Sequence, residues 1–209
     1  MSYADSDSVL AIQGLGKSER QEILKTFLES GMSGYASKAV VYIVFRFADT
    51  TLCYRSKNTP KNHAEINMLT FLRKSYPDDR LKSQRIIMYV STSPCSFCSR
   101  EIKTLAEDGV KVEIVMAGLH HINRASSPPF IPSYYIERNV QGLRDLQNVG
   151  VVVRSFNSQG KQDWNTLATH VLRVDGFKYK ISDRKKEDER LKVDLQTVLE
   201  KGRSKKKFE

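Results

Sequence analysis

Two short motifs constrain this chain more than any other feature of its sequence. The first is His-Ala-Glu at residues 63–65, and the second is Pro-Cys-Ser-Phe-Cys at residues 94–98. Imidazole and thiolate groups, such as those of His63, Cys95 and Cys98, commonly bind zinc. Three protein ligands leave the fourth position of a tetrahedral ion open. Glu65 is not needed as a ligand, so its carboxylate is available to act on a water molecule at that position. The motifs therefore predict a catalytic site that holds one zinc ion per chain.

The residues around the motifs indicate how these groups meet. Ser93 and Pro94 are typical of an N-cap followed by the first residue of a helix. Cys95 and Cys98 then lie on one face of the first turn, where the positive end of the helix favours thiolate. His63 precedes a second segment, residues 66–76, whose apolar spacing predicts a packed helix. Two helix starts that face one another bring the three ligands and Glu65 to one point.

A Cys-x-x-Cys pair has two other common roles. It can be a redox-active dithiol, or it can be half of a structural zinc site. Neither role calls for a His-Ala-Glu triplet elsewhere in the chain, and a closed structural site needs a fourth ligand for which the sequence offers no obvious candidate. The two motifs together favour the catalytic interpretation.

Length and composition predict one main domain. A chain of 209 residues with 40% hydrophobic content can bury an ample core. We expect a flexible N-terminus over residues 1–17, a single zinc-dependent domain over 18–200 and a basic tail over 201–209. No run approaches the roughly 18 apolar residues of a membrane span, so no membrane contact is expected. Residues 1–8 are polar and do not resemble a secretory signal.

Cysteine usage and charge indicate the compartment and the kind of partner. Of the three cysteines, two belong to the motif, so Cys53 cannot support a disulfide framework and is expected in a strand of an intracellular protein. The net charge of +10 favours a polyanionic partner, although a basic surface without a particular partner also fits. Residues 201–207 (Lys-Gly-Arg-Ser-Lys-Lys-Lys) fit a nuclear import signal and an ordinary basic tail equally well, which leaves nuclear and cytoplasmic locations open.

Hydrophobic patterning predicts an α/β fold whose loops carry the site. Helical periodicity covers residues 18–29, with Ser18 as the N-cap. The predicted strands are a β-hairpin at 39–47 and 52–55 and three further strands at 85–92, 110–117 and 149–156. Two C-terminal helices are predicted at 163–172 and 185–200. Together these segments give a central five-stranded mixed sheet flanked by about six helices.

The segment from 118 to 133 is long and rich in proline, and it follows the end of a predicted strand. Long ordered loops in compact domains are often functional. This one contains His120, His121 and Arg124, which are able to stack on bases or to contact phosphate. Paired histidines are also common as plain surface residues, so composition alone leaves both interpretations open.

These residues resemble the AID/APOBEC family of polynucleotide cytosine deaminases, whose zinc motif combines H-x-E with P-C-x-x-C. The similarity covers about residues 38–172. Residues 91–95 (Ser-Thr-Ser-Pro-Cys) are similar to the family's Ser-Trp-Ser-Pro-Cys, residues 117–120 (Ala-Gly-Leu-His) to its Ala-Arg-Leu-Tyr, and residues 164–166 to its Trp-Asn-Thr. The resemblance implies a cytidine-deaminase-like fold.

The resemblance also implies an activity. The implied reaction is the zinc-dependent hydrolysis of cytosine to uracil in single-stranded DNA or RNA, with Glu65 as the group that moves protons. The residues that the resemblance and the loop composition place at the substrate are Asn58, Ala64, Ser91, Thr92, Ser93, His120, His121 and Arg124. Four positions depart from the family pattern. Thr92 replaces a tryptophan beside the base, His120 replaces a tyrosine of the pocket wall, Gly118 replaces an arginine, and Lys38 or Ser37 occupies the region of a threonine near the pocket.

Two other functions remain open. The chain could deaminate free cytidine or deoxycytidine nucleotides or tRNA, or it could bind nucleic acid with little turnover. The Trp-Asn-Thr segment, the Ala-x-Leu segment and the positive charge speak against the first alternative. The intact Glu65 speaks against the second, because nothing structural requires this carboxylate.

Overall fold

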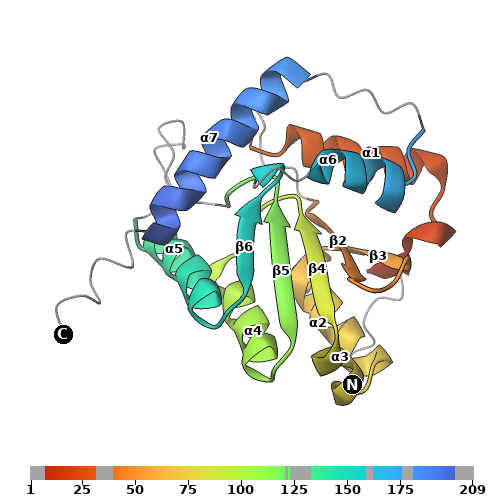
Figure 1. The fold of residues 1–209 in the computed structure, drawn as a ribbon, viewed down its shortest axis with the longest axis horizontal. Helices are drawn as coiled ribbons and strands as arrows, with labels where there is room; N and C mark the ends of the chain where they lie inside the picture. Colours follow the sequence, from red (N-terminus) through yellow and green to blue (C-terminus); the bar gives the residue numbers. More distant parts are fainter. Residues whose placement is uncertain are drawn as a thin grey trace.

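A six-stranded mixed sheet is the centre of the protein, as the computed structural model shows for residues 8–31, 40–120, 122, 133–158, 162–175 and 181–200 (Figure 1). The strands are β1 (Val9–Ala11), β2 (Tyr42–Phe47), β3 (Cys53–Lys57), β4 (Arg85–Val90), β5 (Lys111–Met116) and β6 (Val152–Ser155). Their order across the sheet is β1-β3-β2-β4-β5-β6. The pairs β1–β3, β2–β3 and β2–β4 are antiparallel, whereas β4–β5 and β5–β6 are parallel.

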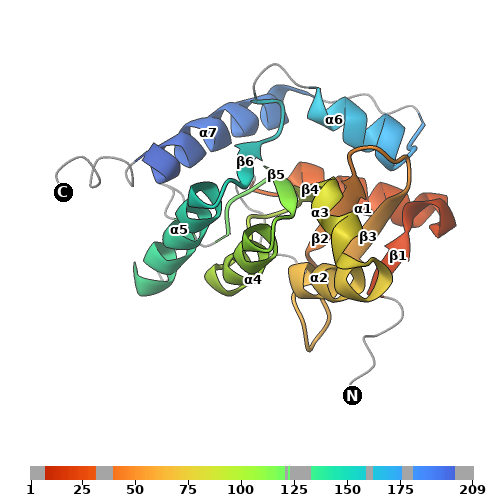
Figure 2. The same cartoon turned by 60° about the horizontal axis from the view of Figure 1, so that its bottom comes forward.

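Helices cover both faces of this sheet. They are α1 (Lys17–Glu29), α2 (Ala64–Ser75), α3 (Asp78–Ser83), α4 (Ser96–Glu107), α5 (Ser133–Asn148), α6 (Asp163–Asn165), which continues as a π-helical segment (Thr166–Val171), and α7 (Ile181–Glu200). A short 3-10 turn, Ile12–Gly14, follows β1. Figure 2 shows α2, α4 and α5 below the sheet, with α6 and α7 above it.

Alternation along the strands explains the two layers. Ile43, Phe45 and Phe47 of β2 point into a core shared with α2, α4 and α5, whereas Tyr42 and Val44 point into a second core shared with α1 and α6. Because successive residues of a strand face opposite sides, a strand buried on both faces is apolar almost throughout. This burial on both faces places the carboxyl ends of β4 and β5, and the loops that leave them, between the helix layers.

The fold class and all five predicted strands are confirmed, and a sixth strand was missed. β1 pairs with β3 through Val9, Leu10 and Ala11, so the flexible segment predicted for residues 1–17 is wrong in its second half. Three residues are too few to show an alternating pattern, which is why this strand could not be recognised. The predicted helix start is wrong by one residue: α1 begins at Lys17 after Gly16, and Ser18 is not its cap.

Further differences lie in the helices. Residues 134–148 received no assignment from sequence and form most of α5. The helix predicted at 163–172 is present, but its residues Thr166–Val171 wind as a π-helix. Cys53 is buried in β3, as predicted. Within the described residues, no helix is both long and apolar enough to cross a bilayer.

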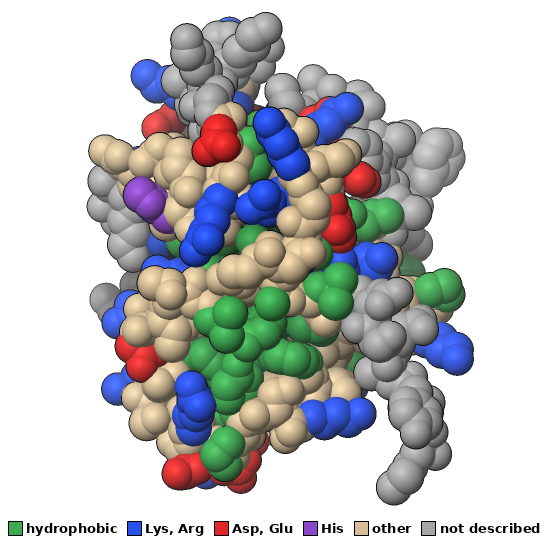
Figure 3. All heavy atoms as spheres, turned by 90° about the vertical axis from the view of Figure 1, so that its right-hand side faces the viewer, with side chains coloured by type: hydrophobic (Ala, Val, Ile, Leu, Met, Phe, Trp, Pro, Cys, Tyr) green, Lys and Arg blue, Asp and Glu red, His purple; other side chains and the backbone are tan. Residues whose placement is uncertain are grey.

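The β1–β3 side of the sheet carries an apolar surface. Figure 3 shows hydrophobic side chains gathered in the middle of the face that lies to the right in Figure 1, with Lys and Arg side chains around them.

Edge strands offer unpaired backbone groups to other chains, and a very short edge strand limits that exposure. β1 has only three residues and thus ends the sheet with little free edge.

A buried ionic network ties β6 to its neighbours. The Arg154 guanidinium donates to the carboxylates of Glu113 on β5 and Asp163 on α6, each with a contact of 2.8 Å, and Arg85 approaches Glu113 at 3.2 Å. Desolvation acts to lower the pKa of Arg154, but the bonds to Asp163 and Glu113 outweigh it and raise that pKa. The charge on Arg154 is therefore stabilised only while its partners are present.

We predict that Asp163→Ala lowers the free energy of unfolding by about 3–5 kcal/mol, because it leaves part of a buried charge unpaired. The measurement is urea denaturation at neutral pH. The control is Lys25→Ala, which breaks an exposed ion pair with Glu29 on α1, with side chains 67% and 33% exposed, and should change stability by less than about 1 kcal/mol. Equal losses in the two variants would contradict this view of the network.

Candidate metal centre

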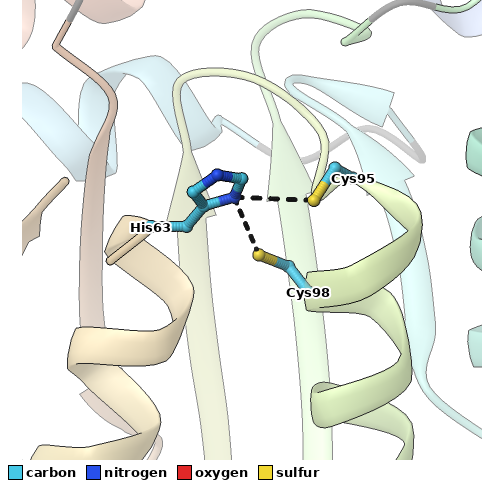
Figure 4. A group of neighbouring side chains, drawn as sticks. All are labelled: His63, Cys95 and Cys98. Carbon is cyan, nitrogen blue, oxygen red and sulfur yellow. Dashed lines mark hydrogen bonds between the residues drawn. The ribbon is translucent and has the colours of Figure 1, made fainter. Parts of the chain in front are cut away.

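His63, Cys95 and Cys98 converge between the N-termini of two helices (Figure 4). His63 is the residue that immediately precedes α2, and Cys95 immediately precedes α4. The ligand atoms of the three side chains lie within 4.8 Å of one another. The Nδ1 atom of His63 is 3.3 Å from Sγ of Cys98 and 3.5 Å from Sγ of Cys95. The predicted meeting of two helix starts is thus confirmed.

The three donors fit a zinc ion. Zn–N bonds of about 2.0–2.1 Å and Zn–S bonds of about 2.3 Å place the nitrogen and sulfur ligands of a tetrahedron ~3.5 Å apart. The two N–S distances of 3.3 and 3.5 Å agree with that spacing. Among the described residues, the group comprises these three side chains, so a bound zinc ion would keep one position for a non-protein ligand. Catalytic zinc sites have three protein ligands and one non-protein ligand, whereas closed structural sites have four protein ligands.

The helix cap that carries the thiols differs from the prediction. Cys95, and not Ser93, is the N-cap of α4, and the helix begins at Ser96. The reason is that Ser93 is engaged elsewhere: its Oγ accepts a hydrogen bond from the His120 backbone N–H at 2.8 Å, and its own N–H donates to Gly118 at 2.9 Å. Cys98 still lies in the first turn of α4, so both thiols point towards His63.

The two thiols interact strongly with each other in the absence of a metal. Hydrogen bonds from Cys98 and the neighbouring His63 together lower the pKa of Cys95 to about 5, although burial opposes the change. The same bond, together with burial, raises the pKa of Cys98. The pair therefore shares one proton, which a metal ion must displace when it binds both sulfurs as thiolates.

Glu65 is buried beside this group, in the first turn of α2, with 4% of its surface exposed. Burial raises the pKa of its carboxyl, and the charge of Cys95 adds to the increase; the backbone N–H of Glu65 itself, Cys98 and His63 oppose it. A carboxyl with a raised pKa is suited both to accept and to return a proton. Nothing in the packing of α2 requires a carboxylate at this position.

The predicted substrate residues are only partly free to meet a ligand. Ala64 is fully buried, and its carbonyl accepts a hydrogen bond from Ser56 at 2.7 Å. Ser91 Oγ accepts from the backbone N–H of Tyr42 at 3.2 Å, and Asn58 Oδ1 accepts from that of Val41 at 2.7 Å. Ser91 and Asn58 thus have structural bonds in this conformation.

The remaining predicted residues lie on the loops that leave β4 and β5. Thr92 is half-buried directly after Ser91, while Ser93 and His120 are joined by the bond already described. The structure therefore brings Thr92, Ser93 and His120 to the carboxyl ends of adjacent strands, near the metal group. His121 and Arg124 lie outside the described residues.

Sequence reasoning missed two residues of α5 that position the site. The buried side chain of Asn139 accepts from the Ser96 N–H at 2.8 Å and donates to the His120 carbonyl at 3.2 Å. At Gly142, a Cβ atom would lie only 2.9 Å from the Cβ of Ser99, so glycine allows α5 to approach α4 closely. A glycine inside a helical pattern was the one available signal; nothing in the sequence indicated the role of Asn139.

Arg184 of α7 is a third residue that the motifs did not indicate. Its buried guanidinium donates to the backbone carbonyls of Ala117 and Ser30, and it lies 4.8 Å from the ring centroid of Trp164. These bonds hold the exit of β5, where Gly118 follows. A Cβ atom at Gly118 would lie 3.3 Å from the N atom of Gly31, which leaves little room for a side chain there.

Comparisons with known proteins agree with this site. The model of the APOBEC4-like AID/APOBEC deaminases matches residues 35–169. The chain therefore belongs to this family of deaminases. The C→U-editing enzyme APOBEC-1 of Mesocricetus auratus is 32% identical over 111 residues, which are 51% of this chain and 42% of that enzyme. The chain thus spans less than half the length of this relative.

Solved structures show a looser likeness. The dCMP deaminase from the cyanophage S-TIM5 in its apo form is 19% identical, with a TM-score of 0.39 over 68% of this chain and 100% of that one. The same enzyme in complex with dCMP and dUMP is 18% identical, with a TM-score of 0.38 over 68% and 99%.

We predict that the purified protein carries one zinc ion per chain, and that His63→Ala and Cys98→Ala each lose most of it, because each removes one of three ligands. Elemental analysis by mass spectrometry measures the zinc content. Cys53→Ala is the matched cysteine control and should keep the metal, since Cys53 is buried in β3 outside the group. Glu65→Gln should keep it as well. Loss of zinc in the Cys53 variant, or retention in the Cys98 variant, would contradict the assignment of the ligands.

Proposed function

We propose that this protein is a zinc-dependent deaminase that converts cytosine to uracil in single-stranded DNA or RNA. The observation that carries the proposal is the buried Glu65 carboxyl beside a group that, among the described residues, offers the three donors His63, Cys95 and Cys98. Structural zinc sites have no use for such a carboxyl, whereas hydrolysis needs a group that transfers protons. Membership of the deaminase family supports the same reaction class.

The roles of the residues follow from their positions. His63, Cys95 and Cys98 would hold the zinc ion, which would supply Lewis-acid activation of a water molecule for attack on C4 of cytosine. Glu65 accepts a proton from that water, delivers it to N3 of the base and then assists protonation of the amino group, which leaves as ammonia. Water thus supplies the new carbonyl oxygen, and the exocyclic C–N bond breaks. The raised pKa of Glu65 suits a group that must both take up and release a proton.

The loops that leave β4 and β5 are the proposed wall of the base pocket. In the proposal, the backbone of Ala64 and Ser93 meets the edge of the base, and Thr92 and His120 flank it. The backbone N–H of His120 donates a hydrogen bond to Ser93 Oγ, which joins the loop after β5 to the loop after β4. Thr92 and His120 are small or only weakly aromatic, and we infer that stacking of the target base is weaker here than with tryptophan and tyrosine at these positions.

A single strand is the proposed substrate form for two reasons. A base inside a duplex must first be unstacked, which costs roughly a few kcal/mol. The net charge of +10 attracts the phosphates of a polymer more strongly than the charge of one nucleotide. The similarity to APOBEC-1 of Mesocricetus auratus, a C→U-editing enzyme, is consistent with this choice.

We predict that the zinc-loaded protein forms uracil in single-stranded oligonucleotides, and that Glu65→Gln reduces kcat by about 10²–10⁴-fold while zinc is retained. Base-resolved product analysis of DNA and RNA strands with several cytosine contexts measures the activity. Glu22→Gln, on the exposed surface of α1, is the control for loss of a carboxylate and should keep full activity.

Salt separates this proposal from the alternatives. The apparent affinity for an oligonucleotide should fall steeply as the salt concentration rises. Binding of the protein releases cations from the strand, and this release is less favourable at high salt. Turnover of free cytidine or dCMP alone, with no uracil in any strand, would overturn the choice of a polymer substrate. Binding without turnover by the zinc-loaded wild type would overturn the proposed reaction.

A further inference from the structure

All strongly exposed aromatic rings among the described residues lie at the start of α4 or α5. Phe97 is 49% exposed, Tyr134 is 48% exposed and Tyr135 is 49% exposed. The other large exposed hydrophobic side chains are aliphatic: Val40, Leu52, Val152 and Val193. Single exposed apolar residues are normal on a protein surface, whereas neighbouring exposed rings such as Tyr134 and Tyr135 mark a candidate site of interaction.

The packing of α4 against α5 shows where these rings lie. Ser96 is bonded to Asn139, and Ser99 is packed against Gly142, so the two helices run in the same direction with position 96 level with 139. α5 therefore extends beyond the start of α4 by more than a turn. Tyr135 is four residues before Asn139 and therefore lies on the same side of α5 as Asn139, which contacts Ser96 at the start of α4.

Arginine side chains accompany the rings. The guanidinium carbon of Arg100 lies 5.2 Å from the ring centroid of Phe97, and that of Arg138 lies 5.8 Å from the ring centroid of Tyr134. The rings of Tyr134 and Tyr135 are 4.1 Å apart between centroids. Arg100 also makes an exposed ion pair with Glu101 at 3.7 Å. We call the set Phe97, Arg100, Tyr134, Tyr135 and Arg138 the aromatic–arginine surface.

We propose that the aromatic–arginine surface binds single-stranded nucleic acid by stacking bases that lie outside the pocket for the target cytosine. Base faces stack on exposed Tyr and Phe rings, and arginine next to such rings meets the phosphates or stacks as well. The surface begins at the first turn of α4, the turn that also carries Cys98, so a strand with one base at the metal centre passes close to it. This inference rests on the proposed function for the position of the strand.

The chemistry also defines the specificity of this contact. Ring faces and guanidinium groups carry no pattern that distinguishes one base edge from another, so the contact tolerates every sequence. The surface therefore contributes affinity for the strand, while the loops after β4 and β5 select the target base. A protein partner could contact the same rings. In that case the affinity of the surface for a nucleic-acid strand would not depend on these rings.

The test is fluorescence anisotropy with a labelled oligo(dT) strand, which contains no cytosine, titrated with zinc-loaded protein carrying Glu65→Gln so that no turnover occurs. On this background, Tyr134→Ala and Tyr135→Ala should each weaken binding by roughly 5- to 150-fold, the range for loss of one stacked base. Tyr135→Phe keeps the ring and should bind like the parent. Leu52→Ala, which removes an exposed aliphatic side chain at the β2–β3 turn, is the matched control and should also bind like the parent.

Salt dependence separates stacking from charge. The tyrosine variants should keep the slope of log affinity against log salt, because they remove no charge. Arg138→Gln should reduce that slope by about 0.7, the value for one phosphate contact on a single strand. Circular dichroism and zinc content check that each variant is folded and loaded.

Unchanged affinity in both tyrosine-to-alanine variants would overturn the inference. A wild type that forms dimers, with Tyr135→Ala monomeric yet unchanged in oligo(dT) affinity, would likewise overturn it and identify a second copy of the chain as the occupant. The two proposals fail separately. Weaker oligo(dT) binding in the tyrosine variants, combined with a wild type that deaminates nothing, would leave the surface assigned and the proposed reaction rejected.

Discussion

The metal centre depends on one packing relationship, the close approach of α4 to α5 on top of the parallel pair β4–β5. His63 and the two thiols can share one ion only if the start of α4 is held at a fixed distance from the start of α2. Gly142 lets α5 approach Ser99, and Asn139 then bonds both Ser96 and the loop after β5. The same helix pair therefore sets the position of the ligands and the wall of the pocket.

The site contains buried ionisable groups that lower the stability of the fold, and a function would explain why they are present. Glu65 is buried without a cation from Lys or Arg described beside it, and the two cysteines form an asymmetric pair that shares a proton. A zinc ion bound by His63, Cys95 and Cys98 would supply positive charge here and would displace the proton that the two thiols share. We therefore expect the metal to stabilise the fold as well as to serve the reaction, because it binds a site that the unfolded chain does not possess.

Local chemistry made the metal ligands predictable from sequence, and long-range contacts made other features unpredictable. Two short motifs contain His63, Glu65, Cys95 and Cys98. Within each motif the residues are so close in sequence that the start of a helix fixes their relative positions. The cap of α4 was assigned to the wrong residue because Ser93 bonds to His120, 27 positions away. The role of Arg184 could not be predicted from sequence. It donates to the backbone carbonyls of Ser30 and Ala117, which are distant in the chain, and every residue type carries such a carbonyl.

The sheet was predictable for a similar reason. Strands buried on both faces carry long apolar runs, so β2, β4 and β5 were evident, whereas β1, at the edge with three residues, was not. The substrate residues are intermediate: the family resemblance names them, but the bonds that Ser91 and Asn58 make to the backbone become visible only in three dimensions.

Zinc K-edge X-ray absorption of the metal-loaded protein tests the central claim, an open His-Cys-Cys centre, most directly. The account predicts two sulfur neighbours at about 2.3 Å and two lighter neighbours at about 2.0–2.1 Å, one from His63 and one from solvent. Three or more sulfur neighbours, or two imidazoles, would show a closed structural site and contradict the account.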